Sequence, residues 1–228
     1  MHNNFLAKRP LLYKIWSNFS KRPNHEKLLY IEKIHYGHVV LDVGANKGYY
    51  TSLFSILVGR HGEVHSFEPV PESYKELLDL KTELKNVFRN NLAVGQESGT
   101  ATINYDPFDS EKATLKNTTS PMPNKHQTQV ISIDEYVEIH KLNILNFIKC
   151  DVEGLELEVL RGAVTTLKTL KPKVSLEITL AKNDLKDAMH LLRSAGYSNF
   201  QKIEKDYPSF NLNTHNYSEE FFYLYATH

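Results

Sequence analysis

The residues whose spacing most suggests chemistry are two carboxylates, Asp42 and Glu68. Each lies where an apolar run meets a loop. Asp42 lies just before a turn at residues 44–48, in which Gly44 can turn sharply and Gly48 can open a helix without a side chain in the way. Glu68 ends the next apolar run about 20 residues later, the offset at which Rossmann-like folds hold a ribose. Because Glu68 can accept both ribose hydroxyls, the pair predicts a nucleotide-like ligand at the turn.

The composition of the turn narrows the choice of ligand. A dinucleotide-binding fingerprint needs a middle glycine, which residues 44–48 (Gly-Ala-Asn-Lys-Gly) lack. The turn also lacks the Gly-Lys-Ser/Thr ending of a P-loop, so it does not indicate a triphosphate. An acidic residue before the turn, Asp42, suits a ligand that carries an ammonium and a sulfonium better than one that carries phosphates. These features predict S-adenosylmethionine as the cofactor.

The elements that must position these residues alternate between strand and helix. Apolar runs bounded by turn residues predict strands at Val39–Asp42, Glu63–Glu68, Asn86–Leu92, Leu145–Asp151 and Lys173–Ile178. Helical spacing of apolar residues predicts helices at Pro71–Leu84, Leu155–Leu170 and Asp184–Ala195, with Gly196 after the last. This alternation predicts an α/β fold with a doubly wound, mostly parallel sheet and helices on both faces.

Polar residues at the carboxyl ends of the predicted strands form one group, because ligands of open α/β sheets bind outside those ends. Five residues fall there: Asp42, Glu68, Asn91, Asp151 and Glu177. Together with the turn they define the expected cofactor-binding set, which is Asp42, Gly44, Ala45, Asn46, Gly48, Glu68, Asn91 and Asp151.

Asp151 and Glu153 are the candidate catalytic residues. Methyl transfer from S-adenosylmethionine is an in-line displacement, for which the protein supplies orientation, desolvation and a base. Asp151 could accept a hydroxyl proton if burial raises its pKa toward neutrality, or it could hold a divalent cation that binds the substrate oxygen. Glu153 could share this role, or it could only stabilise a helix N-terminus, a contact worth about 0.3–1 kcal/mol.

Three further segments resemble the FkbM family of class I S-adenosylmethionine-dependent methyltransferases. Residues 147–163 (FIKCDVEGLELEVLRGA) match the family's I-K-x-D-V-E-G-x-E-x-x-x-L-x-G-A run, and residues 90–95 and 128–136 resemble two segments that precede it. The resemblance covers roughly residues 38–180. It implies a seven-stranded Rossmann-like sheet with an antiparallel last strand at Phe221–Tyr225, Asn91 near the adenine and Asp151 nearest the methyl group. It also implies O-methylation of a sugar, glycan or secondary-metabolite hydroxyl.

Two alternative functions stay open. An NAD-dependent oxidoreductase could use the same strand, turn and acidic residue, although the missing middle glycine and the D-V-E-G run speak against it. A catalytically inactive subunit that binds S-adenosylmethionine would have the same cofactor residues and no turnover.

Other residue types that often carry chemistry receive structural interpretations. Lys149 alternates with Ile148 and Cys150, so we expect its stem to lie along the sheet with its head in water and Cys150 to be an inert core thiol. The eleven histidines include no H-E-x-x-H motif and a single cysteine allows no C-x-x-C pair, so zinc is not expected. His126 and His215 are candidates for a general base on position alone.

Two segments interrupt the alternation. Residues 1–36 begin with basic residues interleaved with apolar residues at helical spacing, which predicts a helical cap on a domain formed by residues 37–228. The same basic amphipathic pattern could contact a membrane surface or a partner. Residues 106–127 are polar and contain Pro107, Pro121 and Pro123, so we expect a mobile lid loop there.

Composition bounds the partners. The chain has 27 basic and 27 acidic residues among its 228, so no overall charge draws it to nucleic acid or a membrane. A single cysteine excludes an internal disulfide, no apolar run approaches the ~18 residues of a membrane span, and the first residues lack the apolar region of a signal peptide. We expect a cytoplasmic enzyme with a small-molecule or glycan acceptor, and the composition leaves its oligomeric state open.

Overall fold

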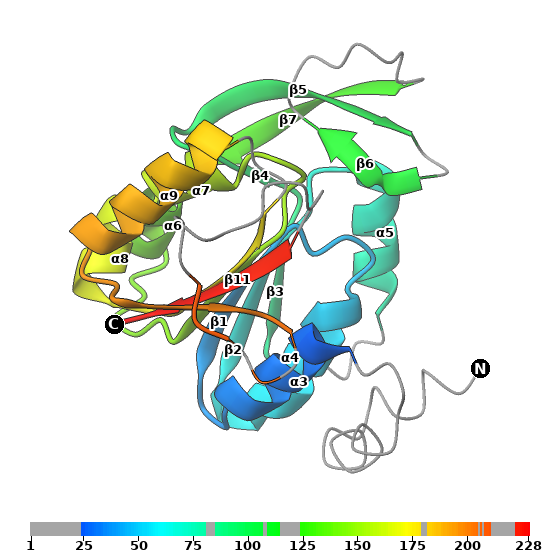
Figure 1. Cartoon of the computed structure of the whole chain (residues 1–228). Coiled ribbons are helices and arrows are strands. Elements are labelled where there is room, and N and C mark those ends of the chain that lie inside the picture. The colour runs from blue at the N-terminus through cyan, green and yellow to red at the C-terminus, as the bar shows by residue number, and fades with distance from the viewer. Residues whose placement is uncertain are drawn as a thin grey trace.

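The computed structural model of the chain describes residues 24–80, 85–106, 109–114, 124–178, 182–204, 206, 208–210 and 222–228. Within these residues a central sheet of seven strands is flanked by helices, and a smaller sheet of four strands lies at one end (Figure 1). The central strands follow the spatial order β10 (Asn199–Lys202), β11 (Phe222–Thr227), β9 (Lys173–Ile178), β8 (Phe147–Cys150), β1 (Val39–Val43), β2 (Glu63–Phe67) and β3 (Val87–Asn90).

Strand directions confirm the predicted α/β fold. β1 pairs in parallel with β2 and β8, and the parallel pairing continues to β3 on one side and β9 on the other. β11 runs antiparallel to both of its neighbours, as the resemblance implied for the last strand. The five parallel strands predicted from apolar runs are all present. β10 was not predicted individually, because a four-residue segment in which only Phe200 is apolar gives a weak strand pattern.

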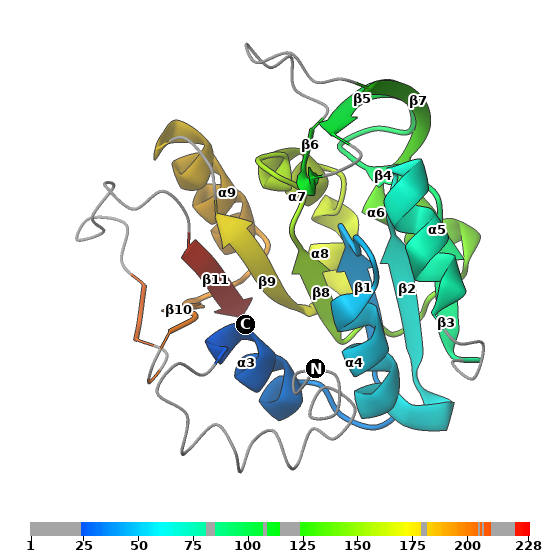
Figure 2. The ribbon, with the colours of Figure 1, turned by 90° about the vertical axis from the view of Figure 1, so that its right-hand side faces the viewer.

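Helices cover both faces of the central sheet (Figure 2). α3 (His25–Lys33) and α4 (Tyr49–Val58) pack on one face, where Tyr30, Phe54 and Val64 share a core cluster. The other face carries four helices, α6 (Ile133–Ile139), α7 (Glu156–Arg161), α8 (Val164–Thr169) and α9 (Lys182–Ser194). A short 3-10 turn, η1 (Gly59–His61), precedes β2, and α5 (Pro71–Asp79) begins with the proline that the sequence places in its first turn.

The predicted single helix over Leu155–Leu170 is wrong, because the chain breaks it into α7 and α8 at Gly162. A Cβ atom on Gly162 would lie 2.1 Å from the carbonyl oxygen of Gly95, so this position contacts a neighbouring backbone. Asp134 of α6 then starts the second helix, since its carboxylate accepts the N–H groups of Thr165 (2.9 Å) and Thr166 (2.7 Å). Partners from distant parts of the chain therefore override a continuous helical pattern.

The close approach at Gly162 supports a stability prediction. We expect Gly162→Ala to lower the free energy of unfolding by about 1–3 kcal/mol, because the added methyl group has no space against the Gly95 backbone. Urea unfolding followed by circular dichroism measures this loss. Gly99→Ala is the matched control, since a Cβ there has no atom within 4 Å. Equal stability of the two variants would contradict the prediction.

The smaller sheet corrects part of the predicted lid. It contains β4 (Ala93–Val94), β7 (Asn124–Ile131), β5 (Gly99–Asp106) and β6 (Asp109–Thr114) in that order. Residues 106, 109–114 and 124–127, which were expected in a loop, are in strands, because β5 pairs with both β6 and β7. Ile103 and Tyr105 of β5 also share a small core with Val70. The rest of the predicted lid, residues 107–108 and 115–123, lies outside the described residues.

The predicted N-terminal cap also lies partly inside and partly outside the described residues. The basic and apolar pattern of residues 1–23 lies outside the described residues, whereas α3, which belongs to the predicted cap, packs on the central sheet. Asn24 caps α3 by accepting the N–H of Lys27 at 2.7 Å. Over the described ranges, no helix has the length and apolar character that crossing a membrane requires.

Candidate active site

The turn after β1 lies against the end of β8. Gly44, Asn46 and Gly48 all have positive φ angles (76°, 49° and 81°), so the chain reverses sharply before α4. A Cβ atom on Gly44 would lie 1.8 Å from the carbonyl oxygen of Asp151. The close approach that Gly44 allows is thus made to the chain's own backbone. Ala45, also in the predicted cofactor set, is buried, and its N–H donates to the Phe67 carbonyl (2.9 Å) at the end of β2.

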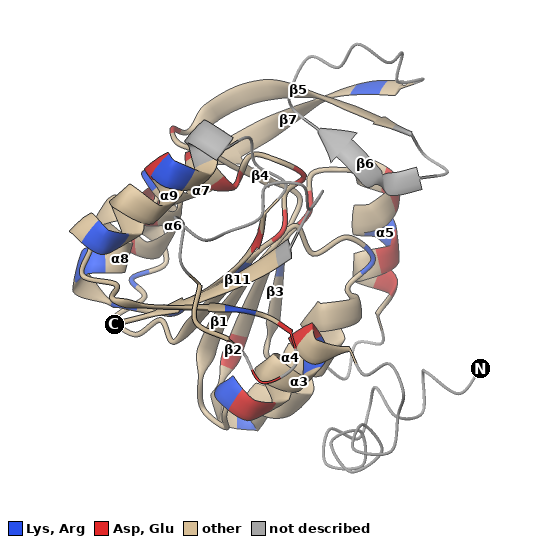
Figure 3. Ribbon diagram, viewed as in Figure 1, with Lys and Arg blue, Asp and Glu red and all other residues tan. Residues whose placement is uncertain are grey.

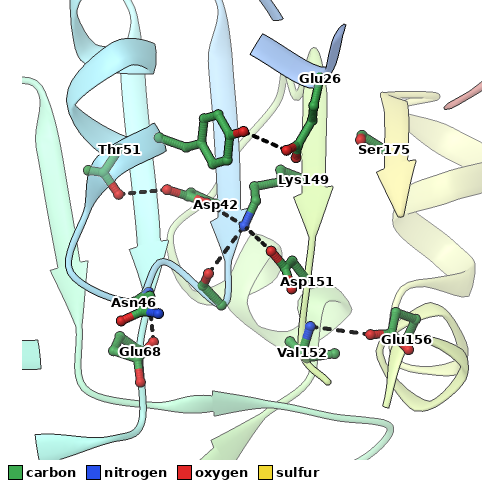
Figure 4. A network of polar contacts seen from close by, with 12 residues as sticks. Glu26, Asp42, Asn46, Thr51, Glu68, Lys149, Asp151, Val152, Glu156 and Ser175 are labelled. Atoms are coloured by element: carbon green, nitrogen blue, oxygen red, sulfur yellow. Dashed lines mark hydrogen bonds and ion pairs between the residues drawn. The ribbon is translucent and has the colours of Figure 1, made fainter. Parts of the chain in front are cut away.

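Glu68 ties this turn to the end of β2. Its Oε2 accepts the N–H of Asn46 at 2.8 Å (Figure 4). Its Oε1 accepts the N–H of Val70, also at 2.8 Å. Each carboxylate oxygen has a second lone pair left for a ligand hydroxyl. Burial of the side chain, which is 5% exposed, raises the pKa of Glu68 to about 7 against the lowering effect of the two N–H groups.

A row of polar residues crosses the central sheet, one residue before the ends of β1, β2 and β8 and at Ser175 within β9. The strand register places Ser66, Asp42, Lys149 and Ser175 side by side. Asp42 is fully buried, and its Oδ2 accepts the hydroxyl of Thr51 at 2.6 Å. Burial raises the pKa of the Asp42 carboxyl, and the nearby Lys149 ammonium opposes that rise. Asp42 therefore lies beneath the turn, within the interior of the protein.

The expectation that Lys149 places its head in water is wrong. The residue is 3% exposed, and its Nζ lies 3.2 Å from the Gly44 carbonyl oxygen, 3.2 Å from Asp151 Oδ2 and 3.7 Å from Asp42 Oδ1. Burial alone would lower the pKa of Lys149, but Asp151 and Asp42 raise it well above its usual range. The sequence contained one signal for this burial, because Lys149 lies in an apolar strand two residues before Asp151 and another predicted strand ends at Asp42. The outcome for Cys150 is as expected, since the thiol is buried in the core.

Helix α3 adds a residue that the sequence analysis missed. Glu26 accepts the hydroxyls of Tyr30 and Tyr50, both at 2.5 Å, and Tyr30 also contacts Ser175 at 3.1 Å. Burial raises the pKa of the Glu26 carboxyl, while Lys149 and the two tyrosines lower it. Helix α3 thereby completes the polar layer around Lys149.

Asp151 and Glu177 form a carboxyl pair at the ends of β8 and β9. Burial would raise the pKa of Asp151, but Lys149 and a hydrogen bond with Glu177 hold it below its usual range, so the rise toward neutrality that the sequence analysis considered does not occur. Burial and the neighbouring Asp151 raise the pKa of Glu177 to about 9. At neutral pH the pair therefore shares one proton, and Asp151 is its more acidic member.

Glu153 lies close to this pair and not at the start of a helix. It has a positive φ of 54° and precedes α7, whose first residue, Glu156, accepts the N–H groups of Val152 and Gly154. The helix-end role considered for Glu153 thus belongs to Glu156. One oxygen each from Asp151, Glu153 and Glu177 lie within 4.8 Å of one another, so these three residues could hold a divalent cation. Figure 3 shows acidic segments gathered at these strand ends.

The remaining candidates lie apart from the carboxyl pair. Asn91 is exposed and donates through Nδ2 to the carbonyl oxygen of Glu68 at 2.8 Å, which places it beside the end of β2. His126 belongs to β7 of the smaller sheet, and His215 lies outside the described residues. The structure thus brings together the turn, Glu68, Asp42 and Asp151, with Asn91 at the edge of this group.

Comparison with known proteins identifies the class. The family model of the methyltransferase FkbM domain matches residues 42–198. The hexuronic acid methyltransferase AglP of Haloferax volcanii is 31% identical over 180 residues, which cover 78% of this chain and 71% of that protein. Methyltransferase 1 of Beauveria bassiana is 26% identical over 180 residues and covers 70% of this chain and 72% of that protein. The chain belongs to the FkbM methyltransferase family.

Solved structures agree on the fold. The FkbM methyltransferase of Methylobacillus flagellatus superposes with a TM-score of 0.57 at 18% identity, over 89% of this chain and 50% of that chain, so this chain spans about half of that protein. Aeropyrum pernix fibrillarin, whose structure contains bound S-adenosyl-L-methionine, gives a TM-score of 0.50 at 13% identity, over 97% of this chain and 76% of that chain. The match at these identities is a match of fold.

The protein is an S-adenosylmethionine-dependent methyltransferase, and the residues at the turn fit that cofactor. Gly44 lets the turn lie directly against the end of β8, and Glu68 keeps acceptor capacity beside the turn. Asp151 is ionised and partly exposed (25% of its side chain) at the adjacent strand end. Carboxyl groups therefore lie on both sides of the turn, and their chemistry suits a cationic cofactor.

Proposed function

We propose that this protein transfers a methyl group to a hydroxyl oxygen of a sugar or glycan. The observation that carries the proposal is the ionised, partly exposed Asp151 carboxylate beside the Gly44 turn. The name of the Haloferax volcanii relative, a hexuronic acid methyltransferase, supports a sugar acceptor. The cofactor residues proposed from the sequence, with Glu68 as the ribose ligand and Asn91 near the adenine, belong to the same proposal.

Asp151 acts as the proton acceptor in this mechanism. When bound, S-adenosylmethionine supplies the methyl group, its carbon–sulfur bond breaks, and the sulfur keeps the bonding electrons. A hydroxyl oxygen that gains a methyl group becomes strongly acidic as the new bond forms, so a carboxylate with a low pKa is a sufficient base. Glu177 holds its own proton beside Asp151 and keeps the pair at a single negative charge. The turn and Glu68 orient the cofactor.

Transfer of a tritium-labelled methyl group to a panel of glycosides tests the proposal. Hexuronic acids offer carboxylate as well as hydroxyl oxygens, and alkali separates the products, since it cleaves a methyl ester and leaves a methyl ether intact. Label that survives alkali supports methylation of a hydroxyl, whereas label that alkali releases would indicate methylation of a carboxylate instead. Cofactor binding without label transfer to any acceptor would favour the inactive-subunit alternative.

A divalent cation at Asp151, Glu153 and Glu177 is the second arrangement that the site allows, because one oxygen from each lies within 4.8 Å of the others. Titration of the protein with magnesium or manganese, followed by calorimetry, distinguishes it from the shared proton. Binding that releases about one proton near neutral pH would favour the cation, since Glu177 must ionise to ligate it.

Cofactor affinity should depend on pH through Glu68. Since burial raises the pKa of this carboxyl to about 7, the form that accepts ribose hydroxyls dominates at pH 8 and is the minor form at pH 6. We expect the dissociation constant for S-adenosylmethionine to rise about tenfold from pH 8 to pH 6. Calorimetric titration at both values measures this change, and in Glu68→Gln it should largely disappear. A pH dependence that persists in Glu68→Gln would assign the effect to another group.

A further inference from the structure

Lys149 contacts the cofactor turn and Asp151 with one ammonium group. Its Nζ lies 3.2 Å from Asp151 Oδ2 (Figure 4) and 3.2 Å from the Gly44 carbonyl oxygen. The centre of the Tyr50 ring lies 5.5 Å from the same atom. The lysine is 3% exposed. A buried ammonium group that is held by several oxygen atoms keeps its charge and has a narrow choice of positions.

The two backbones that Lys149 joins also touch each other. The Asp151 N–H donates to the Val43 carbonyl at 3.1 Å, and the space beside the Gly44 Cα is filled by the Asp151 carbonyl oxygen. A shift of the turn relative to β8 would therefore break the contact of Lys149 with either Gly44 or Asp151. Lys149 therefore contacts the turn, beside which the cofactor is proposed to bind, and Asp151, beside which the acceptor is proposed to bind.

We propose that Lys149 is a positioning residue that holds the cofactor turn against Asp151 and sets the preference of the site between the cationic methyl donor and its neutral product. The inference rests on the proposed function. The positive charge of Lys149 offsets part of the negative charge of Asp42 and Asp151, which lie 3.7 Å and 3.2 Å from Nζ. Without that offset the carboxylates attract a sulfonium more strongly, while S-adenosylhomocysteine carries no charge at sulfur.

Two measurements on Lys149→Met separate position from charge. Hydrogen exchange of peptides that contain residues 44–49, without any ligand, should become at least fivefold faster as the turn loses its contact with the lysine. Calorimetry with S-adenosylmethionine and S-adenosylhomocysteine should show weaker binding of both. The ratio of their dissociation constants should shift about tenfold in favour of the cationic ligand. Lys149→Arg should restore the exchange protection and the ratio toward wild type.

Matched variants complete the experiment. Lys33→Met removes a partly exposed ion pair with Glu32 at the end of α3 and should change neither measurement. If Lys149→Met does not fold, Lys149→Gln keeps a donor for Gly44 without the charge, and the ratio should shift while much of the protection stays. Unchanged exchange and an unchanged ratio in a folded variant would overturn the inference. Wild-type protein that binds neither ligand would instead overturn the proposed function, and the exchange data would still test the lysine contact.

Discussion

Glu68→Ala should weaken S-adenosylmethionine binding by about 100-fold. The substitution removes the acceptor for the Asn46 and Val70 N–H groups, so the turn loses its tie to β2 at the same time as the cofactor loses its ribose ligand. Hydrogen bonds to a charged group contribute about 1.5–3 kcal/mol each, and the loss of even one with a ligand gives an effect of this size. Calorimetric titration at pH 8 measures it.

A control on the same strand separates the site from general damage. Glu63→Ala removes a half-exposed carboxylate at the start of β2, where it pairs with His65 at 3.1 Å, and should leave the dissociation constant within about threefold of wild type. If Glu68→Ala binds the cofactor as wild type does, the ribose assignment is wrong, and with it the position of the cofactor over the turn.

Asp151→Asn should reduce turnover by about 10²–10⁴-fold, the range that proton transfer to a positioned base contributes. The amide has nearly the shape of the carboxylate but cannot accept a proton at neutral pH, so the loss should appear in kcat with a smaller change in cofactor affinity. Single-turnover methyl transfer to the best acceptor from the panel measures the chemical step without product release.

Exposed Asp187 of α9 supplies the comparison for this variant. Its side chain is 65% exposed, and Asp187→Asn should retain full turnover. Turnover in Asp151→Asn that equals wild type would exclude Asp151 as the base and would fit carboxylate methylation, in which the acceptor has no proton to lose. Loss that magnesium restores would point to a ligand role for Asp151 in place of proton transfer.

The predicted strand ends show what local pattern can determine. Val39–Val43 is a strand because a short run rich in valine ends at a turn. Glu63–Phe67 is a strand in which Val64 and Phe67 are apolar, and it ends at Glu68 and Pro69. Both signals need no knowledge of the partner strands. Parallel strands then bring their carboxyl ends to one edge of the sheet. Glu68 and Asp151 were therefore placed near the same turn before any contact was known.

Contacts between distant segments account for what the sequence did not reveal. Lys149 looks solvent-facing by its type, but it is buried because Asp42 across the sheet and Asp151 two residues on compensate its charge. Gly162 interrupts a regular helical pattern because the backbone of Gly95 passes beside it. Glu26 belongs to a segment that the family match does not include and meets the site only through packing of α3 on the sheet.

The sequence by itself determined the α/β class, the glycine turn, the acidic strand ends and the family of this protein, since each depends on residues that are neighbours along the chain. The tertiary structure alone decided which carboxylate is ionised. Asp151 and Glu177 are both carboxylates at strand ends, and the ammonium of Lys149 lowers the pKa of the first while burial and that first charge raise the pKa of the second. Charge state depends on distance and burial in three dimensions, which residue order does not specify.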